Sequence, residues 1–129
     1  MKKPRVLVVE DNAINRMVVE RLVGKRGWPT VSVGDGYAAL TECRRQAFDL
    51  ILMDIRLPGM SGLDAAEQIR ALPGCENVPM LALTAGAAAE DRQQCFDSGF
   101  DGYCTKPFGK EQLFERIEAV LAARRDPEI

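Results

Sequence analysis

The sequence LILMDIRLPGMSG, residues 50–62, begins with four apolar residues and reaches an acid, Asp54, directly before a Pro-Gly loop. A short continuous apolar run that ends in turn residues predicts a fully buried strand of a parallel sheet. A carboxylate at the end of such a strand is costly unless a partner compensates its charge. The partner of Asp54 should therefore indicate what the protein does.

Four further apolar runs predict strands at 5–10, 30–34, 79–84 and 101–105, in addition to the strand at 49–53. Segments with helical periodicity separate them. Five repeats of strand and helix predict a single doubly wound (βα)5 domain of the α/β class, with a parallel sheet covered on both faces. The first and third runs are continuously apolar, so we expect these two strands to be central.

Apolar residues recur at helical spacing in the intervening segments. The residues that share a face are Ile14, Met17, Val18 and Leu22 in the first; Ala39, Leu40 and Cys43 in the second; Leu63, Ala66, Ile69 and Arg70 in the third; and Leu113, Ile117, Val120 and Leu121 in the last. Asn12 is expected to cap the first helix, and Ser61, three residues before Asp64, the third.

The composition restricts the function classes. A chain of 129 residues fits one domain, and a net charge of −2 lacks the basic excess that nucleic-acid binding requires. No apolar run approaches the ~20 residues of a membrane span, and no cleavable signal pattern is present. We expect a cytoplasmic domain with neither a nucleic-acid partner nor membrane contact.

The cysteines and the lack of histidine exclude several kinds of site. Cys43, Cys75, Cys95 and Cys104 form no CxxC pair, and the chain contains no histidine, so a zinc site is not expected. We interpret all four as reduced, mostly buried structural thiols. Without histidine there is also no histidine general base, no histidine-based triad and no self-phosphorylation on histidine.

Acidic residues follow two of the predicted strands. In doubly wound sheets the working site lies outside the carboxyl ends of the strands. If the strands at 5–10 and 49–53 are neighbours, Glu10, Asp11 and Asp54 converge there. Successive strand residues point to opposite faces, so Glu10 and Asp11 can both reach the site only if the chain leaves strand geometry at that point.

Three carboxylates about 5 Å apart repel by roughly 3 kcal/mol per ionised pair, so a cation must compensate. The two possibilities are Mg²⁺, which prefers oxygen ligands, and Lys106 at the end of the fifth strand. Thr84 ends the fourth strand and supplies a hydroxyl. Taken singly, Asp11 would be interpreted as part of a helix cap, Thr84 as a strand end and Lys106 as part of an exposed turn. Together, they favour a site that binds a phosphoryl group and offers it a carboxylate nucleophile.

Four motifs resemble, in order and spacing, those of the receiver domains of two-component response regulators. They are VLVVEDN (6–12), DLILMDIRLPGMSG (49–62), LALTA (81–85) and YCTKPF (103–108). The resemblance covers residues 4–124 and implies a flavodoxin-like fold with strand order 2-1-3-4-5. It implies that residues 1–129 form a single receiver domain, and we expect no output domain in this chain.

The resemblance also implies roles for individual residues. Asp54 would be the phosphoacceptor, and Mg²⁺ or Mn²⁺ would be held by Glu10, Asp11, Asp54 and the backbone carbonyl of Arg56. Lys106 and Thr84 would contact the phosphoryl oxygens. Thr84 and Tyr103 would form the switch, with Tyr103 as its aromatic residue, and the Lys106–Pro107 peptide would be cis. We further expect Arg56 and Gly86 to tune the lifetime of the aspartyl phosphate.

The segment at 10–27 resembles receivers attached to hybrid histidine kinases. The implied phosphoryl donor is a histidine kinase or a histidine phosphotransfer protein. A downstream partner would bind the surface formed by the fourth helix, the fifth strand and the last helix. The chain itself would not be a turnover enzyme, although the parent of an excised hybrid receiver would be a histidine kinase.

Three other interpretations compete. A flavodoxin-type FMN carrier is disfavoured because the loop after the first strand is acidic and would repel a phosphate. A dehalogenase-type phosphatase needs a DxD pattern on the first strand, where this chain has Glu10-Asp11-Asn12. The main alternative is a pseudo-receiver, an interaction module that is not phosphorylated.

Overall fold

Five strands and five helices alternate along the part of the chain that the computed structural model describes, residues 3–85 and 89–124. The strands are β1 (Val6–Val9), β2 (Thr30–Val33), β3 (Leu50–Asp54), β4 (Met80–Thr84) and β5 (Gly102–Thr105). The helices are α1 (Ala13–Gly24), α2 (Gly36–Arg45), α3 (Gly62–Arg70), α4 (Ala89–Ser98) and α5 (Lys110–Arg124). The predicted alternation is confirmed.

All five strands are parallel and lie in the order β2-β1-β3-β4-β5, as the resemblance implied. The predicted first and third strands are both interior, with β3 at the centre. Val9 pairs with Met53 and Thr84 with Thr105, so β1, β3, β4 and β5 end at the same edge of the sheet. This register brings the polar residues that follow the strands to one edge.

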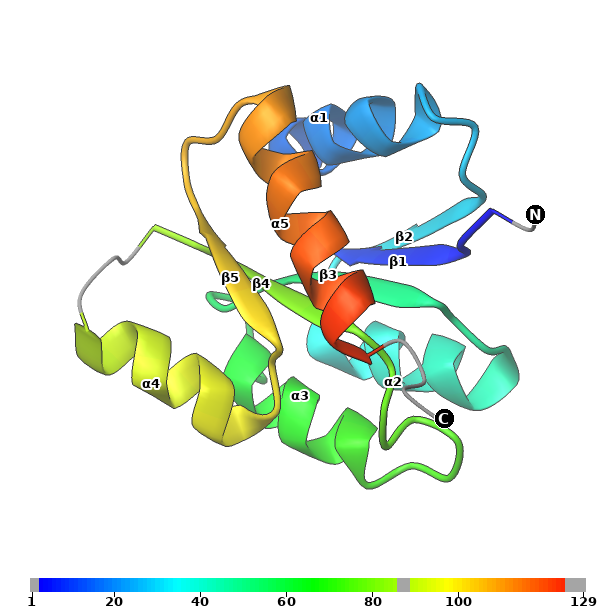
Figure 1. Ribbon diagram of the computed structural model, residues 1–129. Coiled ribbons are helices and arrows are strands. Elements are labelled where there is room, and N and C mark those ends of the chain that lie inside the picture. Colours follow the sequence, from blue (N-terminus) through cyan, green and yellow to red (C-terminus); the bar gives the residue numbers. More distant parts are fainter. Residues whose placement is uncertain (1–2, 86–88, 125–129) are drawn as a thin grey trace.

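Helices cover both faces of the sheet, with α1 and α5 on one side and α2, α3 and α4 on the other (Figure 1). Each face has its own apolar core. Alternate strand residues supply the two cores: Leu7 and Ile51 face α2 and α3, whereas Val8 and Leu52 face α1 and α5. Because both faces are buried, the interior strands are apolar at every position except the last residues of β3 and β4, Asp54 and Thr84, which explains the continuous runs in the sequence.

The orientation of α1 differs from what its periodicity suggested. Ile14, Met17 and Val18 are 72%, 47% and 47% exposed, and the buried residues of this helix are Val19 and Val23. Apolar residues occupy a wider arc of α1 than the sheet can cover, so the sequence pattern alone could not identify the inward direction. The result is an exposed apolar surface on α1.

The other helices bury the predicted faces. Ala39, Leu40, Ala66, Ile69, Leu113, Ile117 and Val120 are all buried. Ser61 caps α3, where its hydroxyl accepts from the backbone N–H of Asp64 at 3.1 Å. Helix α3 ends at Arg70, and Gly74 in the loop that follows adopts a φ of 88°.

Arg70 connects α3 to two loops. Its guanidinium donates to the backbone carbonyls of Gly99 at 2.7 Å and Val78 at 2.6 Å, and to Asp101 Oδ2 at 3.0 Å. It also donates to the carbonyl of Cys75 at 3.2 Å, in the loop that leads into β4. Only 14% of the Arg70 side chain is exposed, so these bonds form a largely desolvated clamp at the amino-terminal edge of the sheet.

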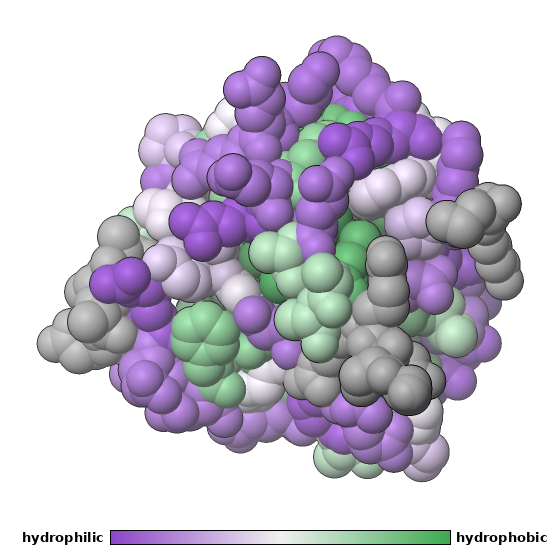
Figure 2. Space-filling model, in the orientation of Figure 1, coloured by the Kyte–Doolittle hydropathy of each residue, from purple (hydrophilic) through white to green (hydrophobic). Residues whose placement is uncertain are grey.

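The surface over α4, β5 and α5 is mostly hydrophilic, with small separate apolar patches (Figure 2). The exposed apolar residues of α4 include Phe96, which is 46% exposed. Among the described residues, no helix is both long enough and apolar enough to cross a membrane.

Candidate functional site

The chain leaves strand geometry at the end of β1, as the convergence of Glu10 and Asp11 requires. Strand β1 ends at Val9, and Asn12 caps α1 by accepting from the backbone N–H of Asn15 at 2.9 Å. The backbone N–H of Asn12 in turn donates to Glu10 Oε2 at 3.1 Å. This short turn lets two consecutive acids face the same side.

Three carboxylates meet at this edge of the sheet. Glu10, Asp11 and Asp54 each offer an oxygen, and these oxygens all lie within 4.8 Å of one another. Glu10 and Asp54 are buried, at 1% and 6% exposure, whereas Asp11 is exposed. The convergence predicted from the strand ends is therefore present.

Lys106 is the cation that compensates the two buried acids. Its Nζ donates to Glu10 Oε1 and to Asp54 Oδ2, both at 2.8 Å. The backbone N–H of Lys106 donates to the carbonyl of Thr84 at 2.7 Å, and the Lys106–Pro107 peptide bond is cis. The unfavourable position of Asp54 at the end of a buried strand is thus explained by the ammonium group of Lys106, the residue that directly follows β5.

Burial and charge shift two groups of this cluster. Burial raises the pKa of the Glu10 carboxyl, the hydrogen bond from Lys106 opposes that rise, and the Asp54 carboxylate adds to it, with a net upward shift. Burial alone would lower the pKa of Lys106, but its hydrogen bonds to Asp54 and Glu10 leave it above the ordinary value. Lys106 is therefore a fixed ammonium ion at neutral pH.

The main chain after β3 orients Asp54. The backbone N–H of Arg56 donates to Asp54 Oδ1 at 3.0 Å, so each carboxylate oxygen of Asp54 has a donor. Gly62 packs against this turn so closely that a Cβ there would lie 2.3 Å from the backbone oxygen of Asp54. The role of the Arg56 carbonyl as a metal ligand stays a prediction.

Thr84 and Tyr103, the predicted switch pair, lie on adjacent strands. Thr84 is buried at the end of β4, whereas Tyr103 on β5 is half-buried. The Tyr103 hydroxyl accepts from Arg92 Nη1 at 3.0 Å, and its ring packs edge-to-face on Phe96 at 6.4 Å. The Arg116 guanidinium lies 5.2 Å from the ring centroid. Their switching role stays a prediction, and Gly86 lies outside the described residues.

Two hollows flank this part of the fold. A pocket of about 360 Å³ beside Glu10 and Lys106 is bordered by Val18 of α1 and by Phe108. The sequence interpretation missed this apolar rim, although the excess of apolar residues in 13–27 was a signal for it.

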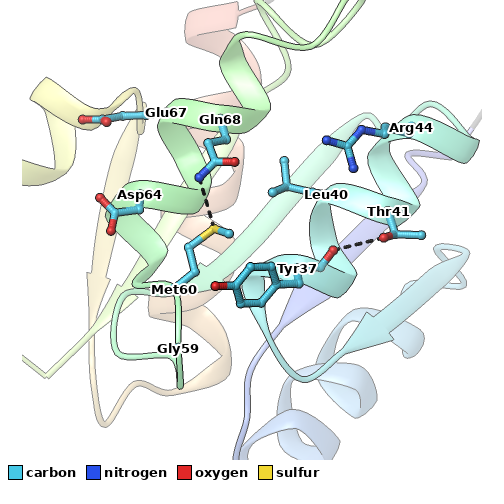
Figure 3. A pocket seen from close by; sticks show the side chains of 9 residues that line it. All are labelled: Tyr37, Leu40, Thr41, Arg44, Gly59, Met60, Asp64, Glu67 and Gln68. Atoms are coloured by element: carbon cyan, nitrogen blue, oxygen red, sulfur yellow. Dashed lines mark hydrogen bonds between the residues drawn. The ribbon is translucent and has the colours of Figure 1, made fainter.

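A larger groove of about 570 Å³ lies between α2 and α3, with Tyr37 and Met60 at its mouth and Gln68 donating to the Met60 sulfur at 3.6 Å (Figure 3).

Among the described residues, Glu10, Asp11 and Asp54 form the only group of three acids or thiols close enough to hold a metal ion. None of these three acids lines the groove, whereas Glu10 and Lys106 line the pocket of about 360 Å³. We therefore locate the candidate site at this smaller pocket.

The family model of the response regulator receiver domain matches residues 6–118. The chain belongs to this receiver domain family. It is therefore a receiver domain of two-component signalling, with the expected parallel fold.

The proteins to which this chain is similar include a sensor protein and a sensor histidine kinase. The sensor protein GacS of Pseudomonas syringae pv. syringae is 44% identical over 119 residues, which is 90% of this chain and 13% of GacS. The receiver domain of the sensor histidine kinase PA1611 of Pseudomonas aeruginosa superposes with a TM-score of 0.86 at 36% identity, covering 94% of this chain and 99% of that one. That structure holds a magnesium ion in its active site cleft.

The chemotaxis response regulator CheY4 of Vibrio cholerae superposes with a TM-score of 0.89 at 28% identity, covering 92% of this chain and 99% of that one. The receiver domain thus matches almost the whole of these two solved structures, but spans about an eighth of the length of GacS.

Proposed function

We propose that Asp54 accepts a phosphoryl group from a phosphohistidine of a histidine kinase or histidine phosphotransfer protein, in a reaction that requires Mg²⁺ or Mn²⁺. One observation carries the proposal. Asp54 shares its site with Glu10 and Asp11 within 4.8 Å and with the Lys106 ammonium at 2.8 Å. A nucleophilic carboxylate, two further acids and a fixed cation are the groups that phosphoryl transfer to a carboxylate needs.

The three carboxylates suit a divalent cation. They supply hard oxygen donors, and Asp11 keeps one side of the cluster open to solvent. Glu10, Asp11 and Asp54 would hold the ion, together with the Arg56 carbonyl. When bound, Mg²⁺ neutralises negative charge on the phosphoryl oxygens.

The protein groups then act on the transferred phosphoryl group. An Asp54 oxygen attacks phosphorus, the new O–P bond forms, and the N–P bond of the phosphohistidine breaks. The leaving imidazole nitrogen keeps the electron pair of that bond and takes up a proton. Lys106 donates to phosphoryl oxygens, the Arg56 N–H holds the carboxylate in orientation, and Thr84 supplies a further donor.

The exposed apolar surface of α1 supports a docking role beside the site. Val18 belongs both to this surface and to the rim of the pocket that contains Glu10 and Lys106. Large exposed apolar side chains next to a reactive group are typical of an interaction site. We propose that the phosphohistidine-bearing domain of the donor covers Ile14, Met17 and Val18.

The identity to GacS supports a more specific proposal, that this receiver domain works within or beside a hybrid sensor kinase. Phosphorylation would then be read through Thr84 and Tyr103. Thr84 would move toward the phosphoryl oxygen, and Tyr103 would shift inward and alter the surface of α4, β5 and α5. Such a rearrangement would break the hydrogen bond between Tyr103 and Arg92, which is therefore a marker of the unphosphorylated arrangement.

The test is phosphorylation of the purified chain by acetyl phosphate, followed by intact mass. With Mg²⁺ we expect the wild-type mass to rise by about 80 Da, one phosphoryl group, and with EDTA we expect no change. Asp54→Asn should abolish the rise. Asp97→Asn, a control at an exposed acid of α4, should keep it.

A mass increase that survives Asp54→Asn would show that the acceptor is another residue. No increase in the wild type, with native circular dichroism and with Mg²⁺ present, would favour the pseudo-receiver interpretation.

A further inference from the structure

The groove between α2 and α3 has two walls of opposite charge. Helix α2 contributes a cation, Arg44, and α3 contributes two carboxylates, Asp64 and Glu67. All three side chains are exposed, whereas Leu40 and Met60, at 4% and 8% exposure, form an apolar floor between them. The groove therefore combines a small apolar floor with an ordered arrangement of charge.

The polar groups of the two walls are not paired within the protein. In the part of the chain that the structure describes, Arg44, Asp64 and Glu67 form neither an ion pair nor a side-chain hydrogen bond. The hydroxyl of Tyr37, whose side chain also lines the groove, has no hydrogen-bond partner there either. Tyr37 is 60% exposed. These four groups are thus available to a molecule that covers the groove.

The groups occupy matching levels on the two walls. Helices α2 and α3 pack side by side and run in the same direction, because each returns from the end of one parallel strand to the start of the next. Tyr37 lies in the first turn of α2 and Asp64 in the first turn of α3, whereas Arg44 and Glu67 lie in the last turns. Figure 3 shows Arg44 and Glu67 on opposite walls at one end of the groove and Tyr37 toward the other end.

This arrangement is self-complementary about a two-fold axis that runs parallel to the two helices. Such an axis places α2 of one copy on α3 of a second copy and keeps the levels along the helices. Arg44 then faces Glu67 of the second copy, and the Tyr37 hydroxyl faces the Asp64 carboxylate of the second copy. The symmetry repeats both pairs, as an isologous interface requires. An axis across the groove would instead place the acidic walls on each other, which is repulsive.

We propose that the groove between α2 and α3 is the interface of a symmetric homodimer, in which α2 of each copy packs on α3 of the other. The occupant is a second copy because each wall carries the charges that the opposite wall lacks. The ring of Tyr37 is the apolar anchor of this contact. Tyrosine is enriched at protein interfaces because its ring buries a large area while its hydroxyl still forms a hydrogen bond.

The local backbone holds this anchor and the floor of the groove in place. Gly59 has a φ of 78°, and a Cβ there would lie 3.2 Å from Cε2 of the Tyr37 ring, so the ring packs directly on the loop. A Cβ on Gly36 would lie 3.2 Å from the Met60 sulfur, so the start of α2 is seated on the same loop. The surface is therefore formed before a partner binds. Because the groove is only about 570 Å³, we expect a weak dimer whose population depends on concentration.

The experiment measures the mass of the full chain in solution by sedimentation velocity, from micromolar to millimolar concentration. We expect the wild type to change from monomer to dimer over this range. The dimer fraction should fall as salt is added, because the facing charges are exposed and are screened. NMR spectra recorded on dilution should show shifts that are confined to the residues of α2, α3 and the loop at 59–60.

Charge reversal tests the pairing directly. Arg44→Glu and Glu67→Arg each place like charges together twice in the dimer, so each should lower the association constant by at least about tenfold. The double variant Arg44→Glu/Glu67→Arg should recover the wild-type association. An equimolar mixture of the two single variants should form a heterodimer, because it retains one native pair and gains one reversed pair.

Two features of the design exclude a general effect of charge. Arg44→Glu makes the net charge more negative and Glu67→Arg makes it less negative, yet both should weaken the dimer. Arg45→Glu is the matched control, because Arg45 lies on the same helix with a side chain that is 68% exposed and does not line the groove. This control should associate as the wild type does.

Three results would overturn the proposal. They are a wild type that stays monomeric at millimolar concentration, a dimer that both charge reversals leave intact, and dilution shifts that map to another face. If circular dichroism shows that a variant does not fold, the dilution shifts of the wild type decide the question. Failure of the dimer would leave the proposed phosphorylation of Asp54 unaffected, because the groove includes none of the three clustered acids.

Discussion

Replacing Asp11 by Asn should stabilise the metal-free protein and remove its response to Mg²⁺. Asp11 contributes a third negative charge to a cluster in which Lys106 already pairs with Glu10 and Asp54. The substitution keeps nearly the same shape and hydrogen-bonding capacity but removes the repulsion. It also removes one of the three carboxylates that we expect to hold the ion.

The magnitude follows from the separation of the oxygens and the exposure of Asp11. At 4.8 Å the repulsion between two unit charges is about 3.5 kcal/mol at an effective dielectric of 20, and about 0.9 kcal/mol in water. Asp11 is exposed, so the lower limit applies, and Lys106 partly neutralises both neighbours. We therefore expect Asp11→Asn to raise the free energy of unfolding by about 1 kcal/mol, or Tm by about 4 °C.

The assay is urea denaturation followed by circular dichroism, with EDTA or with Mg²⁺ at tenfold over the wild-type Kd. The wild type should gain about 1.4 kcal/mol from the metal, and Asp11→Asn should gain almost nothing. Asp97→Asn, a control at an exposed acid outside the cluster, should stay within about 0.5 kcal/mol of wild type and keep the metal response. An Asp11→Asn protein that is less stable than wild type in EDTA and still binds Mg²⁺ would refute this account of the site.

Two further predictions concern the switch and the backbone that supports the site. Beryllofluoride with Mg²⁺ should shift backbone NMR resonances along α4 and β5 in the wild type. The substitution Thr84→Val should reduce the shifts around Tyr103 and leave those at Asp54 unchanged. Wild-type shifts that are confined to the neighbourhood of Asp54 would contradict the switch. Gly62→Ala should lower the free energy of unfolding by about 3 kcal/mol, because its Cβ would lie 2.3 Å from the Asp54 backbone oxygen. Gly24→Ala is the matched control, because nothing lies within 4 Å of its Cβ, and urea denaturation should show it to be neutral or slightly stabilising.

The position of the acids could be predicted because it depends on rules that operate along the chain. Continuous apolar runs identified buried parallel strands, and parallel strands end at a common edge. The resemblance to receiver domains implied the strand order in which the first and third strands are neighbours, and with that order Glu10 and Asp54 had to meet. Asn12 made the turn between strand and helix predictable, since its side chain caps α1 in the manner typical of asparagine.

The inward face of α1 could not be predicted from its pattern. Ile14 and Met17 have the spacing of a core stripe, yet they are exposed, and Val19 and Val23 are buried instead. The rotation of the helix depends on how the turn after β1 delivers it to the sheet. That turn is held by contacts between residues distant in sequence, such as the bond from the Glu10 N–H to the Val33 carbonyl.

The sequence by itself determined the fold class, the edge of the sheet that carries the chemistry, and the residue types available there, because these follow from hydrophobic periodicity and strand ends. Only the tertiary structure decided that Lys106 bonds to both Glu10 and Asp54 rather than to one of them. This outcome depends on how segments that are distant in the sequence pack against one another at the edge of the sheet, and no local pattern encodes that packing.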